Sequence, residues 1–390
     1  MERLTDGRTD LRVQLVSKPG TTKTGIGRYA FELERGLRAA GVDVRSASLT
    51  QPLPEPVARL GRRAGYDVEA FFRSYPLRAD VRPGYITHLT SQTLATLLLT
   101  QRLPRPVVVT VHDILPYLLR DDPALSVYRN QAQRLFDALA MRGLRRADRL
   151  IADSHYTKRT VVDALGIPAG RIDVVHLGVD TERFRPLPVP NAFRMRYGLP
   201  ADRRYVLYVG SEDPRKNVPL LLRAFAMVRR ELPDLILLKV GAAAFPEQRV
   251  RHRELAASLG IADAVRWIDD VPEEDLPLCY NVADVLAFPS RYEGFGFPVL
   301  EALACGTPVV ALRASSVPEL VGDAAVLIDD PAPNVLAAAL ADVLARPRPE
   351  AEPLVSRTRP FSWWRTLAAT HETYGAYRTR EKGVAWTFAS

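Results

Sequence analysis

Short apolar runs recur along the whole chain, separated by longer stretches such as 218–232, where apolar and polar residues follow a helical period. The segments that we interpret as strands lie at 11–16, 42–48, 85–89, 107–111, 149–152 and 172–176, and again at 205–210, 235–240, 265–271, 286–289, 309–312 and 325–328. The most continuous apolar runs among them are 107–111, 205–210 and 309–312. Continuous apolar runs of this length are typical of strands buried on both faces of a parallel sheet. The pattern predicts an α/β protein in which strands and helices take turns along the chain.

The stretch 287–312 shows this alternation most clearly. A short strand ends at Pro289, a loop with two glycines follows at 293–296, and Pro298 stands where the first turn of a helix favours proline. Glycines let the loop backbone come close to a ligand. A helix that starts near Phe297 directs its free amides and its positive dipole end into this loop, an arrangement that favours a phosphate.

Two acidic residues flank that helix start. Glu293 and Glu301 are eight positions apart, so the reach of the chain puts their carboxylates on the order of 10 Å from each other. At that separation they cannot share one proton, but each can accept hydrogen bonds from a separate hydroxyl-bearing group. A nucleotide sugar has this layout, with a hexose and a ribose on either side of a diphosphate. For an isolated pair of this kind, a solvated loop carboxylate and a helix-start charge would be the plainer interpretation.

The run EGFGFPVLE at 293–301, with the ALACGTPVV that follows it, resembles the E-x7-E region of the family 4 glycosyltransferases. The resemblance implies a retaining enzyme of the GT-B fold, with two Rossmann-like lobes, an interlobe cleft and a C-terminal helix that crosses back to the first lobe. It also implies that Glu293 holds hydroxyls of the donor sugar and Glu301 the ribose. It further implies that the donor is contacted by the intervening loop, which consists of Gly294, Phe295, Gly296 and Phe297.

A positively charged loop opens the second half of the chain. The strand near 205–209 ends at Gly210, and Arg215 and Lys216 follow just before the helix at 218–232. The helix dipole disfavours cations at that end, so the pair requires an anion nearby. The resemblance implies that Arg215 and Lys216 stabilise the leaving diphosphate and that Gly210 lies at the donor site. An exposed basic pair is the alternative.

Two positions depart from the family pattern. Many members carry arginine directly after the strand-ending glycine, where this chain has Ser211, and glycine after the strand at 265–268, where it has Asp269. Either Arg215 supplies the missing charge or phosphate binding is weaker. The second departure leaves the identity of the base open.

His112 follows directly on the predicted strand 107–111, so it lies at the carboxyl end of a strand, where α/β sheets bind their ligands. It matches the "HD" position of the family beside the donor sugar, which implies a role in support of catalysis. Asp113 would then orient the ring or cap the next turn; a structural His–Asp hydrogen bond is the alternative. His88 and His176 also lie at strand ends, and we interpret them as structural.

Gly25 and Gly27 open the helix that follows the first strand. Strand, glycine loop and helix together form the geometry that binds dinucleotide phosphates, but the full G-x-G-x-x-G is absent. The resemblance implies that Gly25 and Gly27 line the donor site. Glycines required only for packing of the helix on the strand are the alternative.

The prolines at 186, 188 and 190 stiffen a segment that we interpret as a linker. We therefore expect an acceptor-side Rossmann-like domain at 1–185 and a nucleotide-sugar-binding domain at 186–360. A closing helix and tail would occupy 361–390.

Composition adds few constraints. The chain has 390 residues, is 47% hydrophobic and has a formal net charge of +8. Two cysteines give neither a disulfide framework nor metal-ligand spacing, the start is polar, and no run is long enough to span a bilayer, so we expect a cytoplasmic protein. We interpret the aspartate pairs at 269–270 and 329–330 as turn and capping residues, and the resemblance implies that no metal is needed. The arginine-rich segment 57–82, with Phe71, Phe72 and Tyr75, predicts either a helix on an anionic membrane surface or a solvated helix with its aromatics packed inward.

We therefore expect hexose transfer, with mannose weakly favoured, from a GDP-, UDP- or ADP-sugar to a hydroxyl of a glycan or lipid-linked acceptor. No cofactor and no nucleic-acid partner are expected, and contact with the inner membrane face stays open. A nucleotide-sugar 2-epimerase of the same fold and a non-catalytic sugar-nucleotide-binding protein are the alternatives. An NAD-dependent enzyme is disfavoured, because the third glycine and a matching acidic residue are missing.

Overall fold

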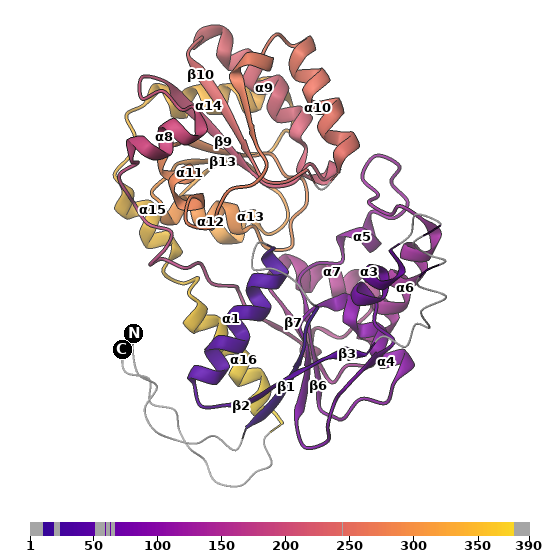
Figure 1. Cartoon of the computed structure of the whole chain (residues 1–390). Coiled ribbons are helices and arrows are strands. Elements are labelled where there is room, and N and C mark those ends of the chain that lie inside the picture. Colours follow the sequence, from indigo (N-terminus) through magenta and orange to yellow (C-terminus); the bar gives the residue numbers. More distant parts are fainter. Residues whose placement is uncertain are drawn as a thin grey trace. The chain divides into compact units, whose positions relative to one another are not determined.

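The computed structural model describes residues 11–18, 24–50, 59, 63, 67–243 and 245–377. It divides into two compact units, which are described separately (Figure 1). Unit 1 comprises Met1–Asp121, Tyr128–Gly178 and Trp363–Ser390, and unit 2 comprises Asp122–Val127 and Val179–Ser362. The boundaries predicted from the sequence, at 185 and 360, lie a few residues from these positions.

Unit 1 is built on a sheet whose described strands are all parallel, in the order β2-β1-β5-β6-β7-β8. The strands are β1 Arg12–Val16, β2 Asp43–Ala47, β5 Ile86–Leu89, β6 Val107–Val111, β7 Arg149–Ala152 and β8 Ile172–Val174. Every residue of β5 and β6 is buried, as expected for strands covered on both faces. The chain adds β2 on one side of β1 and then continues with β5 on the other, so the strand order reverses between β1 and β5.

Helices connect these strands. They are α1 Gly25–Ala39, α3 Val68–Ser74, α4 Leu97–Thr100, α5 Leu115–Leu118, α6 Gln131–Leu144 and α7 His155–Leu165. Side chains of Thr24, Asn130 and Ser154 cap α1, α6 and α7 by accepting a backbone N–H of the first turn.

The helix α16, Trp363–Gly375, returns from the end of the chain and belongs to unit 1. Figure 1 shows it beside α1, and a Cβ added to Gly36 of α1 would lie 2.1 Å from Leu367 Cδ1. The Thr366 hydroxyl donates to the His176 carbonyl at 2.8 Å. The predicted closing helix therefore packs on the first lobe, as the sequence indicated.

Unit 2 repeats the plan with a second sheet of parallel strands, in the order β11-β10-β9-β12-β13-β14. They are β9 Arg204–Val209, β10 Leu235–Val240, β11 Val265–Ile268, β12 Val285–Phe288, β13 Val309–Leu312 and β14 Val326–Ile328. Its helices are α8 Asn191–Tyr197, α9 Val218–Glu231, α10 Pro246–Ser258, α11 Leu276–Val282, α12 Phe297–Ala304, α13 Val317–Val321, α14 Pro333–Ala345 and α15 Ala351–Thr358. Here the strand order reverses between β9 and β12.

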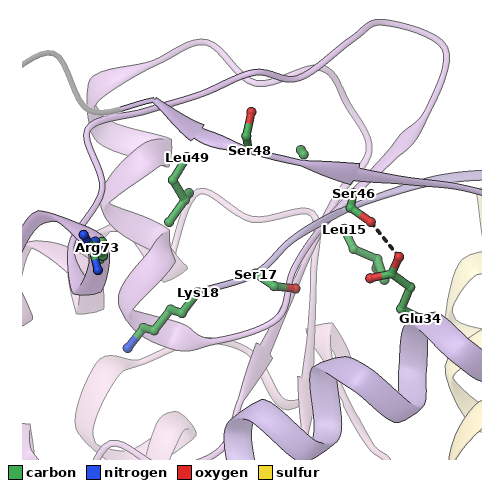
Figure 2. Close-up of a pocket in the computed structure, with 9 residues that line it drawn as sticks. Leu15, Ser17, Lys18, Glu34, Ser46, Ser48, Leu49 and Arg73 are labelled. Carbon is green, nitrogen blue, oxygen red and sulfur yellow. Dashed lines mark hydrogen bonds between the residues drawn. The ribbon is translucent and has the colours of Figure 1, made fainter. Parts of the chain in front are cut away.

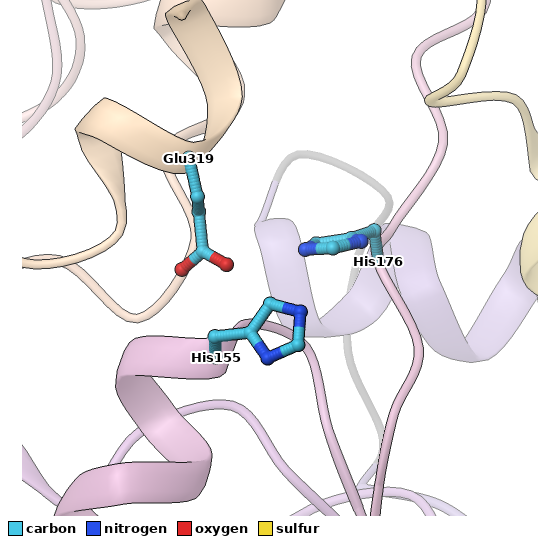
Figure 3. A group of neighbouring side chains, drawn as sticks. All are labelled: His155, His176 and Glu319. Atoms are coloured by element: carbon cyan, nitrogen blue, oxygen red, sulfur yellow. The ribbon is translucent and has the colours of Figure 1, made fainter.

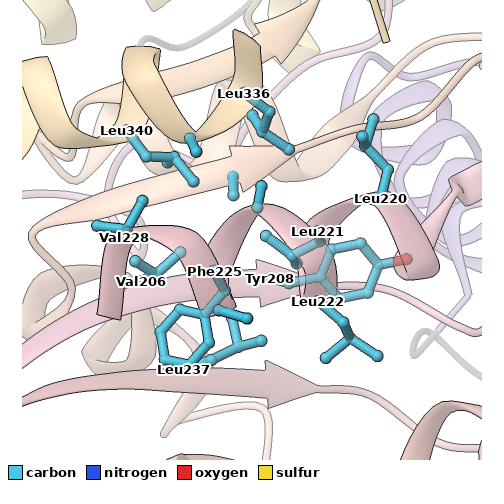
Figure 4. Packing of buried hydrophobic residues seen from close by; sticks show 14 of the residues in the cluster. Val206, Tyr208, Leu220, Leu221, Leu222, Phe225, Val228, Leu237, Leu336 and Leu340 are labelled. Atoms are coloured by element: carbon cyan, nitrogen blue, oxygen red, sulfur yellow. The ribbon is translucent and has the colours of Figure 1, made fainter. Parts of the chain in front are cut away.

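The core of unit 2 lies between this sheet and the helices α9 and α14. Figure 4 shows Leu221 and Phe225 of α9 among Val206 of β9, Leu237 of β10 and Leu340 of α14. All five side chains are buried. This packing fixes α9 against β9, and it thereby fixes the loop that joins them.

The basic aromatic segment differs from a single long helix. Residues 51–58, 60–62 and 64–66 lie outside the described part, α3 covers only Val68–Ser74, and β4 Arg78–Ala79 then pairs with β3 Leu49–Thr50. Phe71 and Phe72 pack edge to face against Phe136 of α6, with ring centroids 5.0 and 5.8 Å away. The described part of the segment thus fits the alternative in which the aromatics pack inward. None of the described helices is long and apolar enough to cross a membrane.

Candidate active site

The strand order of unit 2 places two loops at one edge of its sheet. Loops that follow neighbouring parallel strands meet outside the carboxyl ends of those strands, and ligands of open α/β sheets bind where the strand order reverses. In unit 2 these loops follow β9 and β12. The first carries Arg215 and Lys216, and the second carries Glu293.

Glu293 lies between the two cations. Lys216 Nζ is 3.0 Å from Glu293 Oε1, and an Arg215 guanidinium nitrogen is 3.1 Å from Glu293 Oε2. Burial alone would raise the pKa of the Glu293 carboxyl, but the charges of Lys216 and Arg215 outweigh burial and lower this pKa to about 2. The two cations and the carboxylate that the sequence singled out therefore form one charged cluster, in which Glu293 is buried and the cations are partly buried.

Short backbone contacts hold Arg215 in place. The chain turns through a 3-10 segment at Pro214–Lys216, which the Asp213 side chain caps, and continues through Asn217 at a positive φ of 55°. The Arg215 guanidinium also donates to the Tyr292 carbonyl at 2.7 Å. The loops after β9 and β12 are thus bonded to each other, and the guanidinium is positioned before any ligand arrives.

The glycine loop is supported from behind by two serines. Ser316 Oγ donates to the carbonyl oxygens of Phe295, at 2.5 Å, and of Glu293, while Ser315 Oγ accepts from the Glu293 amide. Gly296 has a φ of 121°, a backbone conformation that only glycine adopts readily. Helix α12 begins at the next residue, Phe297, as the sequence predicted.

Glu301 lies one turn inside α12 and is 2% exposed. Its carboxylate accepts a hydrogen bond of 2.6 Å from the hydroxyl of Tyr280, on α11. Tyr280 orients this carboxylate, and the sequence alone gave no sign of that contact. The ribose contact assigned to Glu301 stays a prediction.

A second charged cluster lies at the carboxyl ends of β9, β10 and β11, and the sequence analysis missed it. Glu212, which is fully buried, is paired with Lys239 of β10 and with Arg249 of α10. Arg249 also pairs with Asp269 at 2.5 Å and lies over the Trp267 ring. Lys239 stands in an apolar strand, so its charge gave no signal of function, but it is the second-to-last residue of β10, near the edge where the loops gather.

This second cluster involves both positions that depart from the family pattern, Ser211 and Asp269. The cations Lys239 and Arg249 lie near Ser211, where many family members carry arginine, but Glu212 and Asp269 neutralise their charges. Gly210 has a φ of 150°, and a Cβ on Gly241 would come within 2.9 Å of its carbonyl oxygen. Glycine is therefore required where these two strand ends approach each other.

In unit 1, His112 follows β6 and is 6% exposed. Its ring lies with Nε2 3.0 Å from the Thr90 carbonyl oxygen and Nδ1 3.3 Å from Asp153 Oδ2. The Asp113 side chain accepts from the Leu115 amide, so it caps the next turn and Asp153 orients the ring. Asp153 directly follows β7, and β7 is the neighbour of β6 in the sheet. With the strand order known, this position alone would have predicted that Asp153 lies close to His112.

Two further histidines of unit 1 are engaged by the protein. His88 is fully buried between the hydroxyl groups of Tyr374, at 2.5 Å, and Thr110, at 2.8 Å. Figure 3 draws His176 with His155, whose rings pack edge to face with centroids 5.6 Å apart. Glu319, drawn in the same figure, belongs to unit 2. For His88, these contacts fit a structural role.

The first strand and helix of unit 1 border a cavity of about 320 Å³ (Figure 2). Lys18, Ser46 and Arg73 are among the residues that line it, and burial lowers the pKa of Lys18 to about 8. Gly25 begins α1, and the Gly27 amide donates to the Thr24 hydroxyl at 3.1 Å. This amide is used by the helix cap, and the donor contacts assigned to Gly25 and Gly27 stay predictions.

The chain matches two family models and a large group of curated proteins. The models are described as glycosyl transferases group 1, matching residues 191–359, and glycosyltransferase family 4, matching residues 23–183. A D-inositol 3-phosphate glycosyltransferase of Catenulispora acidiphila is 32% identical over an alignment of 399 positions, which covers 92% of this chain and 91% of that protein.

Two further matches agree with this result. A GDP-mannose-dependent α-(1-6)-phosphatidylinositol monomannoside mannosyltransferase of Mycolicibacterium smegmatis is 38% identical over 212 positions, 52% of this chain and 54% of that protein. The solved structure of sucrose-phosphate synthase from Thermosynechococcus elongatus is similar in fold, with a TM-score of 0.70 at 24% identity, over 94% of this chain and 98% of that one. The chain therefore belongs to the family 4 glycosyltransferases, and its two parallel-sheet lobes have the GT-B architecture.

Proposed function

We propose that this glycosyltransferase moves a hexose from a nucleoside diphosphate sugar to an acceptor hydroxyl with retention of anomeric configuration. The observation that carries the proposal is the cluster of Glu293, Arg215 and Lys216 at the point where the strand order of unit 2 reverses. Two fixed cations suit a diphosphate, and a carboxylate between them suits the hydroxyls of the attached sugar. Donor binding by unit 2 follows from this layout.

The same groups support the chemistry. When the bond between the sugar carbon C1 and the phosphate oxygen breaks, the electron pair leaves with the diphosphate, and Arg215, Lys216 and the first amides of α12 stabilise the new charge. The acceptor oxygen then bonds to C1 on the face that the diphosphate left. Its proton passes to a diphosphate oxygen, so no carboxylate nucleophile is required.

Relatives favour particular substrates. The name of one relative specifies GDP-mannose, and both curated relatives described above act on acceptors that contain inositol. We therefore favour GDP-mannose as donor and the hydroxyl of an inositol phosphate, free or lipid-linked, as acceptor. Contact with a membrane surface would accompany a lipid-linked acceptor, and it stays a prediction together with the absence of a metal requirement.

One assay separates the proposal from its rivals. The protein is incubated with GDP-mannose, UDP-glucose or ADP-glucose, with and without an inositol phosphate acceptor, both free and lipid-linked, and the products are resolved by chromatography and NMR. We expect free nucleoside diphosphate together with a glycoside of the same anomeric configuration as the donor. An epimerised sugar nucleotide would instead identify an epimerase, and donor binding without turnover would identify a non-catalytic binding protein.

A further inference from the structure

A buried hydroxyl in the loop after β12 is left without a hydrogen bond. Ser290 is 0% exposed, and its Oγ has no hydrogen-bond partner in the described part of the chain. Nearly all buried polar side-chain atoms are hydrogen-bonded, so this exception requires an explanation. Ser290 stands two residues beyond the end of β12, at the edge of the sheet where α/β proteins bind their ligands.

The backbone holds Ser290 beside the charged cluster of the candidate active site. The next amide, that of Arg291, donates to the Arg215 carbonyl at 2.9 Å, so the loops after β12 and β9 are bonded to each other at this point. Glu293 follows two residues later. Burial raises the pKa of the Glu293 carboxyl, the two cations lower it most, and the Ser290 hydroxyl lowers it further. The hydroxyl therefore lies near the carboxylate, although it is not hydrogen-bonded to it in the free protein.

The partners of the Glu293 carboxylate are the groups that a donor would take. Lys216 Nζ is 3.0 Å from Oε1, and an Arg215 nitrogen is 3.1 Å from Oε2. Glu293 is 7% exposed, and a buried charge that loses its hydrogen bonds is costly unless other donors replace them. The sugar hydroxyls are one source of donors. The Ser290 hydroxyl is a second source, which belongs to the protein and is not yet used.

We propose that Ser290 is a positioning residue for Glu293: when a donor diphosphate binds Arg215 and Lys216 in place of the carboxylate, Ser290 Oγ–H donates to the carboxylate and holds it toward the sugar hydroxyls. This inference rests on the proposed function. The hydroxyl is unpaired in the free protein and paired in the complex, so it stabilises only the complex. Stability of the free protein and affinity for a ligand should therefore respond differently to its removal.

The first test measures the stability of the free protein. Ser290→Ala should unfold at the same denaturant concentration as the wild type or at a higher one, since removing a buried hydroxyl without a partner is neutral or stabilising. Ser154→Ala is the matched control. Ser154 is equally buried, but its hydroxyl caps α7, so this variant should unfold at a lower concentration. A lower midpoint for Ser290→Ala would overturn the proposal, because the hydroxyl would then contribute to the free protein.

The second test measures ligand binding. GDP, UDP and ADP are titrated into the wild type by calorimetry, and the nucleotide that binds most tightly is titrated into the variants. Ser290→Ala should bind it about 5- to 20-fold more weakly, the effect expected for one hydrogen bond to a charged group. Ser154→Ala, which changes unit 1, should keep the wild-type affinity. Equal affinities of the wild type and Ser290→Ala would overturn the inference and leave the proposed function standing.

A third measurement shows whether Ser290 acts through Glu293. In the Glu293→Ala protein the hydroxyl has lost its acceptor, so adding Ser290→Ala should not change the affinity further. The same loss of affinity in both backgrounds would mean that Ser290 contacts the ligand itself, and it would overturn the positioning role.

The wild type separates a failure of this inference from a failure of the proposed function. If the wild type binds none of the three nucleotides, the proposed function fails and the role of Ser290 fails with it. If it binds one of them and Ser290→Ala behaves as expected, but no sugar is transferred, only the proposed function fails.

Discussion

At the residue scale, Glu293 has two opposing effects on a donor: it competes with the diphosphate for the cations, and it offers an acceptor to the sugar hydroxyls. In the free protein it pairs with both Arg215 and Lys216, and Asp213 also pairs with Arg215; these are the same cations that a donor diphosphate would bind. The diphosphate of a nucleotide sugar must therefore displace Glu293 from these cations or bind them together with it. The carboxylate then becomes available to the sugar hydroxyls.

Replacing Glu293 by glutamine separates these effects. We expect Glu293→Gln to lower turnover by about 100-fold or more, since the sugar loses a charged acceptor that is fixed in place. The affinity for GDP should rise, because Arg215 and Lys216 lose a competing anion. Initial rates and calorimetric titration measure the two quantities.

Glu273→Gln is the control, since Glu273 also forms an ion pair with an arginine of unit 2, Arg183, at 3.1 Å. It should change neither rate nor affinity by more than about twofold. Wild-type turnover in Glu293→Gln would remove Glu293 from the reaction.

The lowered pKa of Glu293 also predicts how stability depends on pH. The carboxyl has a pKa of about 2 in the folded protein against an ordinary value of 4.5 for glutamate, so the unfolded chain binds its proton first as the pH falls. The stabilisation is complete above pH 4.5 and is lost as the pH falls from 4.5 to 2, by about 3 kcal/mol at most. Denaturant unfolding at several pH values should show a shallower acid decline for Glu293→Gln than for the wild type, and parallel declines would contradict the ion pair.

At the element scale, the sequence predicted the strands of the two parallel sheets, most clearly β12, an apolar run that ends before Pro289. It also predicted the start of α12 from Pro298, since that signal is local. It did not predict the two-residue strands β3 and β4. It could not predict that Asp153 orients His112, because that contact depends on β7 being the neighbour of β6. The Glu212 cluster was not predicted for a similar reason. The partners of Lys239 are identified only when the carboxyl ends of β9, β10 and β11 are known to lie side by side.

Gly296 connects the glycine loop to α12, and its φ of 121° makes it a test of that connection. Gly296→Ala should destabilise unit 2 by about 1–3 kcal/mol and also lower kcat/KM, because the strained backbone shifts the loop that carries Glu293. The matched control is Gly260→Ala, where φ is 70° and a new Cβ would meet nothing within 4 Å. The control should lose stability but keep its kcat/KM. An equal loss of kcat/KM in both variants would contradict a specific role of the Gly296 backbone in positioning the loop that carries Glu293. Thermal unfolding and initial rates give the two readouts.

At the scale of the whole molecule, the two sheets share one plan, since the order of the described strands reverses between β1 and β5 in unit 1 and between β9 and β12 in unit 2. The final helix does not follow the order of the chain, since α16 comes after unit 2 but belongs to unit 1. Its hydrogen bonds explain this placement: Tyr374 contacts the buried ring of His88, and Thr373 donates to Asp173 at 3.0 Å. Unit 1 is therefore complete only when the last described helix of the chain has folded onto it.

Removing residues 363–390 tests this dependence. The truncation leaves His88 without its Tyr374 partner, which alone costs about 1–3 kcal/mol for a buried polar group, and it exposes the face of α1 that Leu367 covers at Gly36. Hydrogen exchange should therefore accelerate in α1, β5 and β8, whereas α9 and β10, whose core is formed within unit 2, keep their protection. Truncation after residue 377 keeps all of α16, so the difference in exchange between the two truncated proteins reports the contribution of residues 363–377. If the longer truncation leaves α1 and β5 as protected as in the full chain, α16 does not contribute to the stability of unit 1.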